Sequence, residues 1–364
     1  MTSSDHINIL QNIPLAPLTT LNIGGPARFF ARAETESQVV EAFAYAHANN
    51  LDVFVLGGGS NILVSDRGFD GLVIQVALKG IVESAAPVFG ASVSATAGGT
   101  DLVTVTAQAG EDLDAFVAFC VENDLAGVEC LSGIPGFVGG TPVQNVGAYG
   151  QEVSETIVSV RCFDRSSGQI RELTSAECGF TYRTSIFNST ERDRYVVLSV
   201  TYALTRHGAP KIAYKDLKDH FADTTPGLGE TRNAVLKIRA AKSMVIDDED
   251  PNSKSAGSFF KNPIVDTRHF EEIAARSDAG AVPHFPAGDG KVKIPGAWLI
   301  ERSGFHKGYR MGNAGISTNH SLALVNVGGA SAAEIVALKE KIQSGVSEKF
   351  DILLQPEPVF VGFQ

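Results

Sequence analysis

Three consecutive glycines, Gly57–Gly59, follow the apolar run Val53–Leu56 in the stretch LGGGSNILVSDRG. Glycines directly after a strand are typical of a turn that binds phosphate, because main-chain amides can approach an anion closely where no Cβ intervenes. The dinucleotide fingerprint G-x-G-x-x-G needs a third glycine, and Ile62 stands there instead. The next residues predict a strand and a turn rather than a helix, and no Gly-Lys-Ser/Thr follows. The sequence therefore argues against a nicotinamide-type Rossmann fold and against a Walker loop, and leaves a bare glycine turn as the alternative.

A second glycine-rich stretch, SGIPGFVGGTPVQNVGAYG, spans residues 132–150 and contains six glycines and two prolines among apolar residues. It lacks the charge of a solvated linker, and its glycines let main-chain amides approach a flat or anionic ligand. The adjacent amides Gln144 and Asn145 offer donors and acceptors that suit the edge of a heterocycle. A purely structural loop is the alternative. Two such loops, on either side of a helix and a strand, suggest one long ligand that spans both.

The overall charge and the cysteines limit the class of protein. Lys and Arg number 30 against 41 Asp and Glu, a net charge of −11, which disfavours non-specific binding to nucleic acid or to an anionic membrane. The four cysteines show no C-x-x-C and no metal-ligand spacing, so we expect reduced thiols and no metal site. No run of 18 apolar residues and no signal-peptide pattern occur, so we expect a cytoplasmic protein.

Hydrophobic periodicity predicts helices and strands that alternate irregularly. A capping box at Thr35 and Gln38 begins a helix over 35–50, and a second capping box at Ser331 and Glu334 begins one over 331–345. Residues 204–231 are polar and contain the helix breakers Pro210, Pro226, Gly227 and Gly229. The fold class expected is α+β, with mixed sheets. Further helices are expected at 111–123 and 231–241, and strands at 53–56, 62–64, 72–76, 102–108, 157–163, 195–202 and, with prolines, in the C-terminal tail.

The chain resembles the UDP-N-acetylenolpyruvoylglucosamine reductase (MurB) family, the flavoenzymes of peptidoglycan precursor synthesis. The resemblance extends from about residue 16 to the C-terminus, with the motifs in the family's order: LGGGSN, GIPGFVGGTPVQNVGAYG, YRTSIF, GSFFKNP and QPEPVFVG. It implies the two-subdomain FAD-binding fold of the vanillyl-alcohol-oxidase type, plus a smaller α+β substrate-binding domain. The implied division is 1–84 with the strand 349–364 returning to it, 85–245 with an insertion at 205–245, and 246–348.

The resemblance implies noncovalent FAD, with NADPH as co-substrate. The first loop would hold the FAD pyrophosphate with backbone amides, and Ile134 to Tyr149 would line the isoalloxazine. A bulky side chain at Gly58 is expected to weaken FAD binding by crowding the phosphate. The cofactor residues implied are Gly57, Gly58, Gly59, Ser60, Asn61, Ile134, Pro135, Gly140, Thr141, Asn145, Gly147, Ala148 and Arg239.

The implied reaction reduces an enolpyruvyl ether to a lactyl ether, by hydride transfer from NADPH to FAD and then to the vinyl methylene carbon. Arg183 matches the arginine that pairs with the enolate, and Glu357 matches a carboxylate that works with it, as a neutral acid. Ser258 matches the residue that gives the proton. Outside this context, the three would be a surface ion-pair arginine, an exposed edge-strand glutamate and a solvated or capping serine.

The implied substrate is a nucleotide sugar, UDP-N-acetylglucosamine enolpyruvate. Tyr149, Tyr214, Lys242 and Asn262 match the residues that bind it, with Lys242 on the diphosphate. Tyr214 lies in a segment long enough to be the tyrosine-bearing insertion of the family's longer form, and we expect this segment to act as a mobile lid. We expect a monomer that binds small-molecule ligands and that binds neither nucleic acid nor a membrane.

Two features depart from the family pattern. Val359 stands where some members carry a basic residue, and the acidic run DDED at 247–250 makes the fit of NADPH there an open question. Two other functions are alternatives: an FAD-dependent oxidase or dehydrogenase of the same fold acting on a hydroxyl substrate, and a non-catalytic flavin-binding protein. Oxidases of this fold often attach FAD through a histidine, and none occurs between His47 and His207.

Overall fold

The computed structural model describes residues 6–84, 101–222, 224–276 and 281–363. The chain forms two compact units, and each is described by itself. Unit 1 comprises Met1–Ile13, Ala27–Gly59 and Asp70–Ala241, and unit 2 comprises Pro14–Pro26, Ser60–Phe69 and Lys242–Gln364. Both combine helices with small sheets, as expected of an α+β protein. The three-part division expected from the sequence stays a prediction, and its first boundary adjoins residues 85–100, which lie outside the described residues.

The first sheet of unit 1 has the strand order β1 (Ile9–Pro14), β2 (Pro26–Ala33), β5 (Phe69–Val76) and β3 (Val53–Leu56). Strand β3 pairs in parallel with β5 and leads directly into the first glycine run. Helix α1 (Glu36–Ala48) begins as predicted, because the Thr35 side chain accepts a hydrogen bond from the amide of Gln38. The sequence thus predicts the strand that delivers the glycines, and β5 begins at Phe69, three residues before the expected start.

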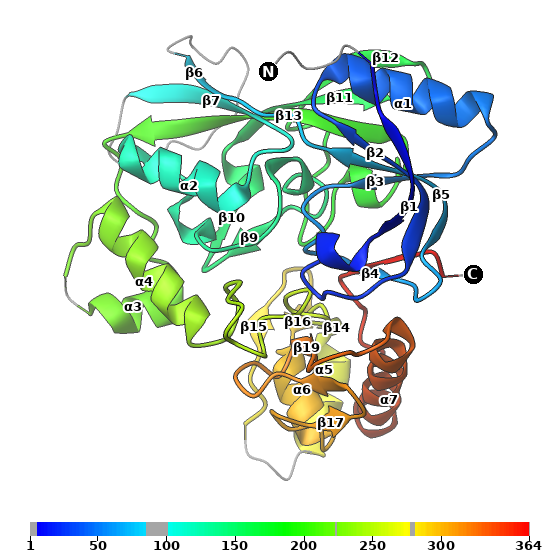
Figure 1. Cartoon of the computed structure of the whole chain (residues 1–364). Helices are drawn as coiled ribbons and strands as arrows, with labels where there is room; N and C mark the ends of the chain where they lie inside the picture. The colour runs from blue at the N-terminus through cyan, green and yellow to red at the C-terminus, as the bar shows by residue number, and fades with distance from the viewer. Residues whose placement is uncertain (1–5, 85–100, 223, 277–280, 364) are drawn as a thin grey trace. The chain divides into compact units, whose positions relative to one another are not determined.

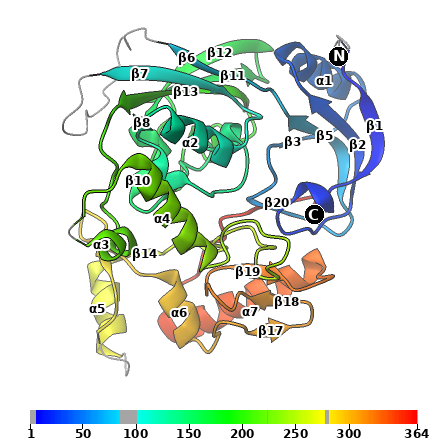
Figure 2. The same cartoon turned by 60° about the vertical axis from the view of Figure 1, so that its left-hand side comes forward.

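In the second sheet of unit 1, neighbouring strands pair in antiparallel fashion. Its buried side chains form a large part of the hydrophobic core of this unit. Helix α2 (Leu113–Glu122) covers this sheet (Figures 1 and 2), with the Phe116 ring 4.8 Å from that of Tyr202. Helix α1 also contacts this sheet, through Phe43 on Phe163 with ring centroids 5.3 Å apart. The order is β12 (Gln169–Thr174), β11 (Ile157–Asp164), β13 (Tyr195–Arg206), β7 (Leu102–Gln108) and β6 (Ile81–Ser84), with β8 (Leu125–Ala126) on β13.

The polar segment 204–231 contains a short helix, α3 (Lys215–Phe221), which the sequence pattern did not predict. The apolar residues Leu217 and Phe221 are four positions apart and pack beside α4 (Leu228–Ala240), with Leu217 fully buried. Figure 1 shows the two helices side by side. Helix α4 starts three residues earlier than expected, because the Glu230 carboxylate accepts the Gly227 amide at 2.8 Å.

Unit 2 packs its helices against short strands. The longest helix, α7 (Ala332–Phe350), starts at the predicted capping box, in which Ser331 accepts the amide of Glu334 at 3.1 Å. The C-terminal strand β20 (Val359–Val361) pairs in parallel with β4 (Ile62–Val64), so the tail is a strand that returns to an early part of the chain. The other elements are α5 (Thr267–Ala275), α6 (Gly296–Arg302), and two sheets: β14 (Ile264–Asp266), β16 (Lys291–Lys293), β15 (Phe285–Pro286), and β17 (Arg310–Met311), β18 (Ala314–Ile316), β19 (Leu324–Asn326).

Two further observations concern the chain as a whole. Within the described ranges, no helix is long and apolar enough to cross a membrane. The cysteines Cys120, Cys130, Cys162 and Cys178 are all buried thiols, and burial raises the pKa of the Cys178 thiol to about 12. Because a thiol with such a pKa stays protonated near neutral pH, these residues behave as core side chains.

Candidate functional site

The two glycine loops of unit 1 meet backbone to backbone at Gly58 and Gly136. A Cβ added at Gly58 would lie 2.6 Å from the Cα of Gly136 and 3.0 Å from the amide nitrogen of Phe137. Such distances are shorter than any normal carbon contact, so only glycine allows this approach. The expectation that a side chain at Gly58 first crowds a phosphate therefore needs correction, because it would first collide with the second glycine loop.

Gly57 and Gly140 form the open part of these loops. A Cβ added at either residue would meet no atom within 4 Å, although Gly57 is half-buried. Gly59 has φ +67°, the left-handed conformation that glycine adopts without strain. Backbone next to open space at Gly57 and Gly140, on loops that pack backbone to backbone at Gly58, suits a ligand that binds through its phosphates and a flat ring. The open space at Gly57 and Gly140 therefore fits FAD.

Arg183 is fixed on the carbonyl groups of the second glycine loop. Its Nη2 donates to the carbonyl of Gly147 at 2.6 Å and its Nη1 to that of Asn145 at 3.3 Å. Gly147 belongs to the strand β9 (Gly147–Ala148), which pairs with β10 (Gln151–Glu152). Arg183 has φ +52° and Asn145 has φ +45°, which is uncommon outside glycine and is often found at functional sites. The predicted catalytic arginine and the predicted flavin loop therefore form one rigid assembly.

The side chains of Asn145 and Thr141 are used by the protein itself. The Asn145 amide donates to Glu152 at 2.9 Å and to the carbonyl of Thr181 at 3.1 Å. The Thr141 hydroxyl lies 2.9 Å from the hydroxyl of Tyr202 in the core. These side chains stabilise the conformation of the loop, so a cofactor would contact the backbone of Asn145 and Thr141. The half-buried residues Ile134, Pro135 and Ala148 follow the same loop.

The two predicted substrate tyrosines lie together in unit 1. The rings of Tyr149 and Tyr214 pack edge to face, with centroids 5.5 Å apart and an interplanar angle of 88°. Tyr214 is 45% exposed and immediately precedes α3. Tyr149 has φ +50°, like the other strained residues of this region. The insertion thus contacts the end of the second glycine loop through an aromatic pair.

Arg239 on α4 is a buried cation, 6% exposed. Burial lowers the pKa of its guanidinium, and the charges of Tyr149 and Asp114 oppose that shift. An arginine nevertheless stays protonated at neutral pH, so unit 1 carries a positive charge in a dry environment beside Tyr149. Such a charge favours an anionic ligand. It provides a local positive potential in a protein whose net charge is −11.

Asp114 anchors α4 and the second glycine loop, a role that no motif or spacing in the sequence indicates. Its carboxylate accepts two bonds from Arg232, at 2.5 and 2.9 Å, and one from the amide of Gly133 at 2.6 Å. Burial raises the pKa of Asp114, but these hydrogen bonds outweigh burial and hold the pKa below its usual value. The carboxylate therefore stays charged and ties the start of the loop to the insertion.

In unit 2, Ser258 lies against a histidine that sequence reasoning missed. The Ser258 Oγ is 3.1 Å from the Nε2 of His320. The two segments are joined by the amide of Phe259, which donates to the carbonyl of Leu322 at 2.7 Å. Glu357 lies on the other side of the same segment, and its amide donates to the carbonyl of Phe259 at 2.9 Å. The predicted acid and the predicted carboxylate are therefore neighbours along paired backbones.

Asn61 contacts the backbone around Glu357 within unit 2. Its side-chain amide donates to the carbonyl of Glu357 at 3.3 Å, and its own carbonyl accepts the amide of Val359 at 2.9 Å. Ser60 precedes it, and the Ser60 carbonyl lies 3.5 Å from the hydroxyl of Thr20. The roles of Ser60 and Asn61 at a pyrophosphate stay predictions, while the contact of Asn61 with the backbone of Glu357 is observed.

Lys242 and Asn262 have different surroundings in unit 2. The Oδ1 of Asn262 accepts the amide of Gly296 at 2.8 Å, which places it at the first residue of α6. Lys242 is half-buried and precedes Ser243, whose hydroxyl accepts the Asn319 amide at 2.9 Å. In the acidic run, burial raises the pKa of Asp250, but hydrogen bonds from Ser243 and Asn252 outweigh it and lower the pKa.

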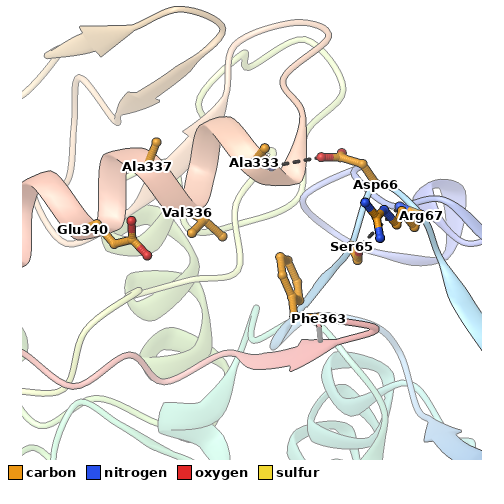
Figure 3. Close-up of a pocket in the computed structure, with 8 residues that line it drawn as sticks. All are labelled: Ser65, Asp66, Arg67, Ala333, Val336, Ala337, Glu340 and Phe363. Atoms are coloured by element: carbon orange, nitrogen blue, oxygen red, sulfur yellow. Dashed lines mark hydrogen bonds between the residues drawn. The ribbon is translucent and has the colours of Figure 1, made fainter.

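A surface pocket near the start of α7 contains none of the predicted site residues. Figure 3 shows Asp66 reaching the first turn of this helix, where its carboxylate accepts the amides of Ala332 at 2.7 Å and Ala333 at 3.0 Å. The carboxylate already satisfies the helix N-terminus, so this pocket is not an anion site. Its lining residues are Ser65, Asp66, Arg67, Ala333, Val336, Ala337, Glu340 and Phe363.

Comparison with known families gives two matches along the chain. A model described as the UDP-N-acetylenolpyruvoylglucosamine reductase C-terminal domain matches residues 250–361, and one described as an FAD binding domain matches residues 27–174. The second match spans the helix α2 and the whole of both glycine loops and confirms FAD as the cofactor. It also confirms the expected FAD-binding fold class.

Curated relatives match over nearly the full length. A UDP-N-acetylenolpyruvoylglucosamine reductase of Thermobifida fusca is 45% identical over 97% of this chain and 98% of its own. One of Streptomyces coelicolor is 42% identical over 98% of this chain and 91% of its own. The crystal structure of the reductase MurB from Thermus caldophilus has a TM-score of 0.63 at 24% identity and covers 98% of both chains, which shows a shared fold. On this identity and coverage, the chain belongs to the UDP-N-acetylenolpyruvoylglucosamine reductase family.

Proposed function

We propose that the protein reduces UDP-N-acetylglucosamine enolpyruvate to UDP-N-acetylmuramate with NADPH as reductant. The observation that carries this is the 45% identity, over almost the whole of both chains, to a relative that bears the reductase name. The two alternatives, an oxidase of the same fold and a non-catalytic flavin protein, are not favoured, because curated relatives that match over the full length are named as reductases. The reaction would be a step of peptidoglycan synthesis, and the protein would thereby contribute to cell wall formation, cell shape and cell division.

The residues of unit 1 would hold FAD, which when bound supplies the hydride for the substrate double bond. Gly57 and Gly140 leave open space beside backbone amides, and Gly58 brings the two loops together. Arg239 adds a buried positive charge. These features support the proposed roles of Gly57 to Gly59 on the pyrophosphate and of Ile134 to Ala148 on the ring system. Ser60 and Asn61, which follow in the chain and belong to unit 2, are proposed for the pyrophosphate as well.

Arg183, Glu357 and Ser258 would carry the chemistry on the substrate. Reduction of the vinyl carbon leaves negative charge next to the carboxylate, and a fixed cation lowers the energy of that enolate. Arg183 suits this role because two carbonyl groups hold its guanidinium in place. Glu357 would assist as a neutral acid, and the Ser258 hydroxyl would give the proton that completes the lactyl ether.

The remaining residues would bind the nucleotide sugar. Lys242 would neutralise the diphosphate, and Asn262 would hydrogen-bond the sugar or its ether through the donors that its carboxamide provides. Tyr149 and Tyr214 would cover the substrate, and their packed rings support a shared role. The division into 1–84 with 349–364, 85–245 and 246–348, a monomer and a cytoplasmic location are further proposals.

Tyr214→Phe is expected to raise the substrate KM and to leave flavin reduction by NADPH nearly unchanged. The phenylalanine keeps the ring that packs on Tyr149 and removes only the hydroxyl that would reach the substrate. Steady-state kinetics and stopped-flow absorbance measure the two effects. Tyr309→Phe, which changes a tyrosine in unit 2 that packs on Phe305, is the matched control. Equal loss in both half-reactions would refute the assignment of Tyr214 to a substrate lid.

The proposed function is tested on the product. Purified holoenzyme, NADPH and the enolpyruvyl nucleotide sugar are incubated, and the nucleotide sugar is analysed by mass spectrometry. The expected product is heavier by two hydrogens and forms in step with NADPH consumption. Consumption of NADPH without this product, or release of hydrogen peroxide in proportion to turnover, would favour the oxidase alternative.

A further inference from the structure

We propose that His320 is a positioning residue for Ser258: its imidazole fixes the serine hydroxyl and replaces the proton that the serine gives away. The inference rests on the proposed function, because it assumes that Ser258 protonates the substrate. The observation behind it is the 3.1 Å separation between the His320 Nε2 and the Ser258 Oγ. This is a normal hydrogen-bond distance between a ring nitrogen and a hydroxyl.

The segments that carry the two residues are held together next to the contact. The residue after Ser258 donates its amide to the carbonyl of Leu322 at 2.7 Å, two residues beyond His320. Gly257, directly before Ser258, has φ +73°, so the chain turns sharply into the serine. A backbone hydrogen bond therefore holds the two segments together next to the Ser258–His320 contact.

The loop that carries His320 is also fixed independently of Ser258. The amide of Thr318 donates to the Oδ1 of Asn252 at 3.0 Å, and the side chain of Asn319 donates to Ser243 at 2.9 Å. The carbonyl of His320 itself accepts the amide of Ala323 at 3.1 Å. These bonds hold the backbone around His320 in place before any substrate binds, and a preorganised site requires such support.

The chemistry explains why a serine needs such a partner. A serine hydroxyl is a poor acid, so when its O–H bond breaks and a C–H bond forms on the substrate, the alkoxide left behind must be stabilised. An Nε2–H that donates to Oγ stabilises this negative charge and directs the serine proton away from the imidazole, toward the substrate. In the imidazolium form, the Nε2–H bond then breaks as the serine O–H bond forms again. The neutral imidazole regains its proton from solvent.

A double-mutant cycle on the FAD-loaded enzyme tests this. His320→Ala is expected to slow flavin reoxidation by substrate by roughly 10–100-fold, the loss typical of one hydrogen bond to a charged group. Reduction of the flavin by NADPH should stay within about twofold of the parent rate, because it does not use Ser258. In a Ser258→Ala background, adding His320→Ala should cause no further loss. His320→Gln, which keeps an N–H donor, should recover part of the rate.

A second readout does not depend on activity. Imidazole nitrogen resonances of the apo or FAD-loaded protein should show a shift of the His320 Nε2 signal in Ser258→Ala. A signal that stays unchanged would overturn the inference. A double variant slower than Ser258→Ala by the same factor that His320→Ala causes alone would do so as well, because His320 would then act independently. Failure of the proposed function would look different, since the parent enzyme itself would not reoxidise with the enolpyruvyl substrate.

Discussion

Ser258→Ala is expected to reduce its flavin with NADPH at close to the parent rate and to reoxidise it with substrate at least ~10²–10⁴-fold more slowly. The first half-reaction needs no acid from the protein, whereas the second must place a proton on the carbon next to the enolate. Loss of a positioned general acid typically costs this factor. Ser258→Cys should recover part of the loss, because a thiol is a stronger acid of similar reach.

Stopped-flow absorbance at the flavin band measures each half-reaction of these variants separately. Ser253→Ala is the matched control, because Ser253 lies in the same segment and its hydroxyl donates to the carbonyl of Asp247 at 2.6 Å. We expect the control to match the parent in both steps. An alanine variant at 258 that reoxidises at the parent rate would remove Ser258 from the mechanism and leave Glu357 or a bound water as the proton source.

Gly58→Val and Gly57→Ala are expected to lose FAD for different physical reasons. At Gly58 the new side chain must displace the backbone of Gly136, which lies 2.6 Å from the Cβ position, so the two glycine loops separate. We expect the free energy of unfolding to fall by about 1–3 kcal/mol, as in overpacked cores, together with loss of bound FAD. At Gly57 the methyl group enters open space, so the fold should keep its stability while FAD affinity falls at least ~10-fold, or about 1.4 kcal/mol.

The melting temperature of the apoprotein and the FAD content separate the two effects. FAD is measured in the supernatant after acid precipitation, where a noncovalent flavin should appear completely. Gly229→Ala is the control, because a Cβ there also meets no atom within 4 Å but lies on α4. Full FAD occupancy and affinity in Gly57→Ala would contradict the role of this glycine, and flavin that stays in the pellet would contradict noncovalent binding.

Local signals in the sequence predict much of the fold. The capping pairs Thr35 with Gln38 and Ser331 with Glu334 mark real helix starts, since each satisfies amides that would otherwise lack partners. The alternation at 102–108 predicts β7 with its observed ends, because one face of that strand is buried. The glycine runs predict where backbones approach a ligand, although only the structure distinguishes Gly57, which is open, from Gly58, which is packed.

The features that the sequence does not predict depend on distant residues. Helix α3 is short, and what stabilises it is the burial of Leu217 in a cluster with Cys130 and α4 rather than helix propensity. His320 is 62 residues from Ser258, and nothing in its own neighbourhood marks it as a partner of the serine. Asp114 binds Arg232, 118 positions away, and Gly133, 19 positions away. Such long-range contacts leave no periodic or spacing signal in a single sequence.

The most direct test of the proposed reductase is the flavin absorbance of the purified protein under anaerobic conditions. NADPH should bleach the yellow oxidised flavin, and the enolpyruvyl nucleotide sugar should restore the colour in one turnover, with formation of one equivalent of the lactyl ether. A flavin that NADPH bleaches but that only oxygen, and not this substrate, can restore would contradict the account.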